Sequence, residues 1–178
     1  MNNRQPHNIE AEQSVIGAAF ISKSALQKVC EELDNTSFFN EAHGKIFDVL
    51  KELYQSGIAV DIMTVTDRLK SKKLLKEIGD VDYLLEIVNS VPTASNVDYY
   101  INIVREKAIL RNLIDTATNI VTDAYNETGS INETLDDAER KILNVVKNRK
   151  SSEFKPIQEA LSKAQLNLET LASSGSEI

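Results

Sequence analysis

The stretch from Val97 to about Tyr125 most constrains the fold, because no glycine or proline interrupts a helical pattern there. Its apolar residues recur at helical spacing, which predicts one long helix. These residues are Leu110, Leu113, Ile114, Ala117, Ile120, Val121 and Ala124. Asn126–Gly129 then supplies a turn, and Ser130 and Glu133 have the spacing of a capping box that starts a second helix reaching roughly Arg149. The two helices are expected to form an antiparallel hairpin.

The second arm of this hairpin carries a narrow apolar stripe. Its members are Ile131, Leu135, Ala138, Ile142 and Val145, separated by four, three, four and three residues. This spacing is typical of a seam where one helix packs along another. We therefore expect the stripe to face the first arm.

The region before the long helix is predicted to form a lobe of shorter helices. The chain has only six Gly and three Pro, and no long run alternates apolar and polar residues, so the predicted fold class is all-α. The expected helices span Ile9–Ile21 behind the cap Asn8, Ala25–Leu33, Glu41–Gln55 behind the cap Asn40, Asp61 to near Lys73, and Tyr83–Val88. The connector Val91–Asn96 contains Pro92 and suggests a boundary. The predicted domains are a globular lobe at 1–95, the hairpin at 96–150, and a hinge with a C-terminal linker helix at 151–178.

The C-terminal segment changes character at the polar hinge Lys150–Glu153, and Pro156 suits the first turn of a new helix. An apolar docking stripe follows, formed by Ile157, Leu161, Ala164, Leu168 and Leu171. A helix of this length is marginal alone in water, so it needs a surface to pack on. That surface is either another molecule, a missing part of a longer parent protein, or this chain's own lobes.

Charge and composition exclude several functions. The net charge of -7 and a pI near 4.9 give no positive field to hold nucleic acid. The longest apolar or small run, Val15–Ile21, is far shorter than the roughly 20 residues of a membrane span, and the N-terminus lacks a signal-peptide pattern. Cys30 is the single cysteine, so disulfides and cysteine-based zinc sites are excluded within one chain. A cytoplasmic protein is expected.

No catalytic or metal site emerges from the titratable residues. His43 lies five residues before Asp48, so on a helix the two diverge by about 140°. The acidic pairs Glu31–Glu32 and Asp136–Asp137 face different ways and indicate solvated surface. Two clusters of basic residues are interpreted mainly as solvated helix ends. The alternative is that either cluster contacts the phosphate backbone of a nucleic acid. The two clusters are Arg68, Lys70, Lys72, Lys73 and Lys76, and Arg140, Lys141, Lys147, Arg149 and Lys150.

A series of short motifs resembles the N-terminal part of DnaB-type bacterial replicative helicases, in the family's order from Pro6 to about Leu171. The opening Pro6–Gly17, PHNIEAEQSVIG, is similar to the family's entry motif. The other matching segments are Phe38–Phe39, Ala42–His43, Ile46–Phe47, Val60–Val65, Gly79 ahead of Tyr83–Leu84, Val91–Ala94 with Asn96, Ile103–Ala108, Leu110–Arg111, Asp137–Glu139, Lys141–Ile142 and Phe154–Ile157.

The resemblance implies a function in replication. It implies a helical lobe, a hairpin through which protomers pair, as a dimer or as a hexamer built as a trimer of dimers, and a linker helix that docks on the neighbouring motor domain. A DnaG-type primase is the implied partner, with a helicase loader as a further candidate. The implied primase contacts are Tyr83, Ile114, Ile120 and Ile131, for which ordinary core or protomer packing is an equal alternative.

The same resemblance assigns catalysis to a part that this sequence does not contain. The chain has no G-x-x-x-x-G-K-[ST] phosphate loop, so we expect no cofactor here, with ATP and magnesium in a following motor domain and DNA bound only through the full-length parent. Two other classes stay open. One is a small helical nucleic-acid-binding regulator, which would be retained on single-stranded DNA in a salt-dependent way. The other is an enzyme of unknown type, which would need converging titratable groups.

Overall fold

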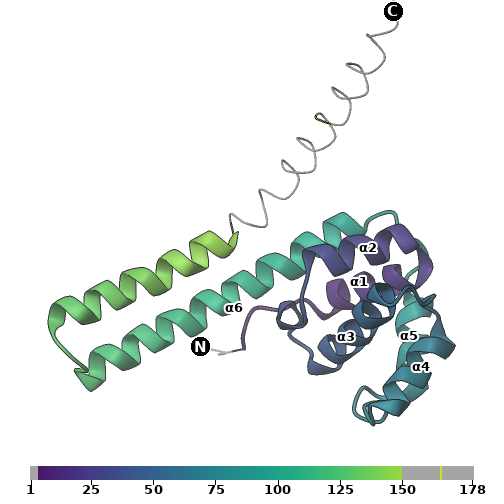
Figure 1. Ribbon diagram of the computed structural model, residues 1–178, viewed down its shortest axis with the longest axis horizontal. Helices are drawn as coiled ribbons and strands as arrows, with labels where there is room; N and C mark the ends of the chain where they lie inside the picture. Colours follow the sequence, from purple (N-terminus) through teal and green to yellow (C-terminus); the bar gives the residue numbers. More distant parts are fainter. Residues whose placement is uncertain (1–3, 150–164, 166–178) are drawn as a thin grey trace, which may run out of the picture. The chain divides into compact units, whose positions relative to one another are not determined.

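The computed structural model describes residues 4–149 and residue 165, and all regular structure among these residues is helical (Figure 1). The elements are α1 (Ile9–Ile21), α2 (Lys23–Glu32), the 3₁₀ helix η1 (Asn35–Ser37), α3 (Glu41–Gln55), α4 (Ile62–Ser71), α5 (Asp80–Ser90) and α6 (Val97–Asn126). A helix over 131–149, called the arm helix below, follows α6. The all-α prediction is confirmed. The predicted linker stripe, Ile157, Leu161, Ala164, Leu168 and Leu171, lies outside the described residues.

Side-chain caps start the helices where the sequence predicts them. The Asn8 side chain accepts a hydrogen bond from the backbone N–H of Ala11, 2.9 Å away. Asn40 caps α3 in the same way, and Asp61 forms a capping box with Thr64 at the start of α4. Each cap satisfies a backbone donor that the first helical turn leaves without an intrahelical partner.

Helix α1 packs against α2, α3 and α5, so it is buried on most of its surface. Val15 and Ile16 have no exposed surface. Gly17 permits the close approach of α5, because a Cβ atom at this position would lie 2.5 Å from Cγ2 of Val91. The predicted face of α3, which includes Ile46 and Leu50, completes this core.

Helix α5 is longer than its apolar pattern predicts, since it spans Asp80–Ser90 rather than Tyr83–Val88. The predicted break at Gly79 and Asp80 is present, and both residues have positive φ angles of 101° and 67°. This left-handed turn lets the chain reverse, and the Asp80 N–H donates to the Leu75 carbonyl oxygen at 2.9 Å. Polar residues extend the helix on its solvent side, where periodicity carries no signal.

The first turns of α6 belong to the core of the lobe. Val97, Ile101 and Val104 are buried in the same cluster as α1 and α3. The connector at 91–96 therefore joins two parts of one packed body, although its proline marks a break between helices. The chain divides into two compact units between Ile114 and Asp115, inside α6.

The second unit contains the end of α6 and the arm helix, which run antiparallel side by side (Figure 1). The predicted capping box is present: the Ser130 N–H donates to the Glu133 carboxylate at 2.9 Å, and the Glu133 N–H donates to the Ser130 hydroxyl at 3.3 Å. Lys141 and Asp123 form an ion pair at 2.5 Å between the two helices. The tip of the predicted hairpin is thus observed.

The predicted seam on the arm helix is largely uncovered, which corrects the expectation that it faces the other arm. Val145 is buried, but the exposed fractions of Ile131, Leu135 and Ile142 are 71%, 59% and 38%. Two helices touch along a narrow strip, so they cannot cover an apolar surface wider than that strip. Periodicity identified an apolar face, but it did not identify what covers that face.

Candidate protein-docking site

A buried polar cluster supports Tyr83 from inside the lobe. The Tyr83 hydroxyl lies 2.7 Å from Nε2 of His43, and Nε2 of Gln13 donates to the same hydroxyl at 3.3 Å. The two rings are nearly parallel, with an interplanar angle of 3°. The cluster therefore joins α1, α3 and α5 through the polar end of one tyrosine.

Glu12 extends this cluster on the far side of His43. Its Oε1 lies 3.5 Å from His43 Nδ1 and accepts a hydrogen bond from the Asn40 N–H at 3.2 Å. His43 is fully buried and Glu12 is 2% exposed. Sequence reasoning missed this pair because it compared His43 only with Asp48 on the same helix. The available signal was that His43 lies three residues before Ile46, on the apolar face of α3.

Tyr83 also lines a shallow cleft on the lobe. The cleft is formed by Asn40, Ala42, Glu77, Ile78, Gly79, Asp82, Tyr83 and Glu86. Three carboxylates make its rim acidic, and one of them, Glu77, is paired with Lys45 at 2.5 Å. Tyr83 thus has its hydroxyl on the buried cluster while it remains partly exposed. Such a residue connects the core with a surface that a partner can reach.

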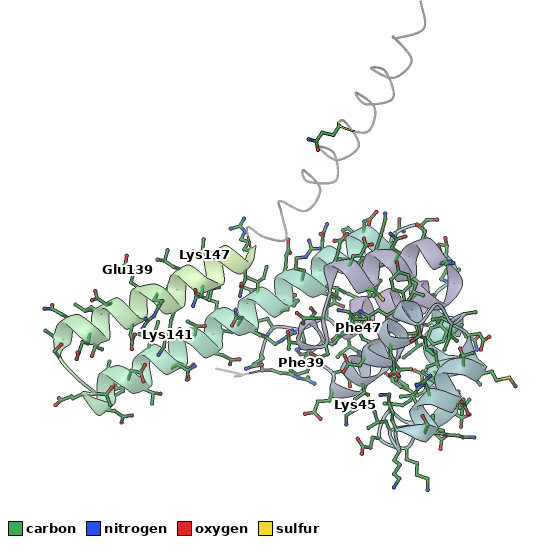
Figure 2. All side chains as sticks on the ribbon, in the orientation of Figure 1. Phe39, Lys45, Phe47, Glu139, Lys141 and Lys147 are labelled. Carbon is green, nitrogen blue, oxygen red and sulfur yellow. The ribbon has the colours of Figure 1, made fainter. Side chains whose placement is uncertain are left out.

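In the second unit the arm helix carries a continuous apolar stripe. Ile131, Leu135, Ile142 and Val146 are separated by four, seven and four residues, which places them within about 60° of one another around the helix. All four are exposed, with exposed fractions from 38% to 71%. We call these four residues the arm stripe. Figure 2 shows Glu139 and Lys147 on the outer side of this helix and Lys141 on the side of α6.

The structure places the four implied primase contacts as follows. Tyr83 lies on α5 beside the acidic cleft, and Ile114, 41% exposed, ends the first unit. In the second unit Ile120 is half-buried on α6, whereas Ile131 begins the arm helix and belongs to the arm stripe.

Several lysine and arginine side chains of the two basic clusters form ion pairs with nearby carboxylates. Arg68 and Lys72 both pair with Glu52, at 2.8 and 2.9 Å, and Lys72 lowers the pKa of that carboxyl below its usual value. In the second cluster Arg140 pairs with Asp137, and Lys141 pairs with Asp123. These neutralised side chains favour the interpretation of solvated helix surface over a nucleic-acid path.

The described residues offer little for metal or thiol chemistry. Within residues 4–149 and 165, no three His, Cys, Asp or Glu side chains gather as metal ligands would. Cys30 is buried, and this burial raises the pKa of its thiol to about 11. Helices long and apolar enough to cross a membrane do not occur in this part of the chain.

Residues 4–106 match a family model described as the DnaB-like helicase N terminal domain. The match covers more than half of the 178 residues. The chain belongs to the DnaB-like helicase N-terminal domain family. The matched range includes α1–α5 and the first turns of α6, so Glu12, His43 and Tyr83 all lie within it.

Curated relatives of this DnaB-like domain are replicative helicases. The replicative DNA helicase DnaC of Bacillus subtilis is 42% identical over 172 residues, covering 96% of this chain. The replicative DNA helicase DnaB of Geobacillus stearothermophilus is 43% identical over 173 residues, covering 97% of this chain. The DnaB-like chain spans 38% of the length of each of these relatives.

Solved structures share the fold. The crystal structure of the N-terminal domain of the DnaB helicase from Mycobacterium tuberculosis has a TM-score of 0.75 and 38% identity, covering 80% of this chain and 99% of that one. A DnaB-like replicative helicase, solved in a study of its interactions with primase, has a TM-score of 0.64 and 23% identity. It covers 78% of this chain and 31% of its own, and it shows the fold alone.

Proposed function

We propose that this DnaB-like domain is the assembly and docking module of a replicative DNA helicase. In this role its hairpin pairs protomers, as a dimer or within a hexamer built as a trimer of dimers, and the lobe and hairpin bind a DnaG-type primase. The arm stripe carries the proposal. Four large apolar residues lie on one side of the arm helix, and each of them is 38% to 71% exposed.

The energetics favour a partner on this stripe. Full burial of a large apolar side chain contributes about 1.5–3 kcal/mol, and the four residues, which are 38% to 71% exposed, would each gain part of this on association. Scattered exposed apolar residues are normal on proteins, but an aligned set of this kind is typical of an interface. A second copy that presents the same stripe would form a two-fold symmetric contact.

Primase is the second proposed partner. One structural neighbour was studied for its interactions with primase, which supports this partner. The candidate contacts implied by the sequence resemblance are Tyr83, Ile114, Ile120 and Ile131. In this proposal primase prefers one arrangement of the hairpins and shifts the population of rings toward it, which alters unwinding or priming. A helicase loader is a further candidate for the same surfaces.

Catalysis and DNA translocation are assigned to the rest of a longer protein. The chain spans 38% of the length of the two bacterial relatives. We propose that ATP and magnesium bind in a motor domain beyond this region and that the segment 151–178 docks on the neighbouring motor. This module would then have no enzymatic activity or cofactor of its own, and it would work in the cytoplasm and touch DNA only through the parent protein.

A titration with primase tests the proposal. The C-terminal region of the primase from the same genome is titrated into this chain in a calorimeter, with Ile131→Asp and Asn132→Asp as a matched pair. Both variants add one acid at the start of the arm helix, where the helix dipole favours it, but the two positions lie about 100° apart. We expect binding by the wild type and by Asn132→Asp, and about tenfold weaker binding by Ile131→Asp. Absence of heat with the wild type contradicts the proposal.

A further inference from the structure

The polar side chains of Glu12, His43 and Tyr83 form a cluster that is costly to bury, so the presence of this cluster in the core calls for an explanation. Glu12 is 2% exposed and its Oε2 atom has no hydrogen-bond partner. An unsatisfied buried polar atom destabilises a fold, and well-packed apolar residues often replace buried polar pairs without loss of stability. Packing alone therefore does not account for these three side chains.

The Tyr83 hydroxyl takes part in two hydrogen bonds. The Tyr83 oxygen accepts from Gln13 Nε2, so its single proton is available to donate to His43 Nε2 at 2.7 Å. Nδ1 of His43 lies 3.5 Å from Glu12 Oε1 and makes no hydrogen bond within the described residues. The Asn40 N–H donates a hydrogen bond to that carboxylate oxygen at 3.2 Å, so the Glu12 end of the cluster is attached to the N-cap of α3.

Within the cluster of Glu12, His43 and Tyr83, it is Tyr83 that reaches the surface. Its ring lines the acidic cleft with Asp82 and Glu86, and its Cβ would lie 3.0 Å from a Cβ atom at Gly79. The absence of a side chain at Gly79 therefore lets the Tyr83 ring pack close to the backbone at the start of α5. Within this packing, the 2.7 Å hydrogen bond to His43 is the shorter of the two hydrogen bonds that orient the Tyr83 hydroxyl.

We infer that Glu12 and His43 are positioning residues that hold Tyr83 in the orientation in which it binds primase. This inference rests on the proposed function, because it takes Tyr83 as a primase contact. Neither positioning residue touches the partner. They act by removing the alternative orientations of Tyr83 that binding would otherwise have to exclude, which is preorganisation.

The experiment has one readout that needs no partner. The side-chain order of Tyr83 is measured by NMR in the wild type, in His43→Leu, in His43→Gln and in Val49→Ala. His43→Gln supplies an amide oxygen that can accept a hydrogen bond from the tyrosine hydroxyl. Val49→Ala perturbs the buried face of α3 at a residue outside the cluster of Glu12, His43 and Tyr83. We expect rotamer averaging of Tyr83 in His43→Leu, partial rescue in His43→Gln, and no change in Val49→Ala. An ordered Tyr83 in His43→Leu overturns the inference.

The second readout is primase affinity in a double-mutant cycle. His43→Leu and Tyr83→Phe are each expected to weaken binding about three- to tenfold, and the double variant by no more than the larger single effect. Losses that multiply overturn the inference, since they show that His43 acts independently of the Tyr83 hydroxyl. If the wild type binds no primase while Tyr83 order still depends on His43, the proposed function fails and the positioning of Tyr83 by His43 stands.

Discussion

Arg111 and Pro6 are 105 residues apart in the sequence, yet the Arg111 guanidinium donates a hydrogen bond to the Pro6 carbonyl oxygen across 2.9 Å. A second bond of 2.9 Å reaches the carbonyl oxygen of Ser37. The guanidinium carbon also lies 5.8 Å from the centre of the Phe39 ring, on which the His7 ring is stacked. One buried arginine thus fastens the N-terminal segment and the loop before α3 to α6.

Replacement of Arg111 by lysine is predicted to destabilise the lobe by about 1–3 kcal/mol, because an ammonium group cannot reproduce the planar fork that serves two carbonyl oxygens. Thermal unfolding followed by circular dichroism measures the change. Arg105→Lys is the control, since Arg105 makes a more exposed ion pair with Glu32 and its loss is expected to cost less than about 1 kcal/mol. Equal effects of the two substitutions contradict the proposed fastening.

Gly17→Ala is predicted to destabilise the lobe through a clash between α1 and α5. Helix propensity alone favours alanine by about 1 kcal/mol, so a net loss reports the clash directly. The added Cβ would lie 2.5 Å from Val91 Cγ2 and 3.1 Å from the Ile87 carbonyl oxygen. We expect a net loss of about 1–3 kcal/mol in denaturant unfolding. Combination with Val91→Ala should recover part of it, and strictly additive losses would argue against the contact.

The capping box of the arm helix is predicted to make the hairpin sensitive to acid. The hydrogen bond from the Ser130 backbone lowers the pKa of Glu133 below its ordinary value of 4.5. The pKa of Glu133 is lower in the folded state than in the unfolded state. The charged carboxylate therefore stabilises the cap at pH values above the unfolded-state pKa, and this stabilisation is lost as the pH falls through the folded-state pKa. Helicity measured between about pH 6 and 3 should therefore fall less steeply in Glu133→Gln than in the wild type. Glu139→Gln, which removes an exposed carboxylate outside the cap, should behave as the wild type.

Cys30 is predicted to react slowly with thiol reagents while the lobe is folded. Burial raises the pKa of its thiol to about 11, so the reactive thiolate is scarce at pH values near 8. A chromogenic disulfide reagent should react about a hundredfold more slowly with the native protein than with the unfolded one. Rapid stoichiometric reaction under native conditions would show that the packing of α2 is looser than described.

Local signals in the sequence were sufficient for most of the fold. Helical periodicity located the helices, and the caps Asn8 and Asn40 fixed where two of them begin. These features depend on residues within one or two turns of each other, so a linear sequence displays them. The extent of α5 was underestimated because its first turn after Gly79 carries polar residues.

The site was less accessible from the sequence because it depends on contacts between distant segments. Glu12, His43 and Tyr83 come from three helices, and no local pattern reveals that they meet. Periodicity showed that the arm helix has an apolar face, but the structure was needed to show that Ile131 and Leu135 remain uncovered. The family motifs supplied the candidate partner, which neither periodicity nor charge indicates.

The association state of matched variants shows whether the arm stripe joins two copies of this protein. Sedimentation equilibrium is measured for the wild type, for Leu135→Glu in the arm stripe, and for Asn144→Glu, which adds the same charge on the opposite side of the arm helix. We expect self-association for the wild type and Asn144→Glu and monomers for Leu135→Glu, with unchanged helicity in all three. A wild type that stays monomeric at high micromolar concentration, or equal association of the two variants, would contradict this expectation.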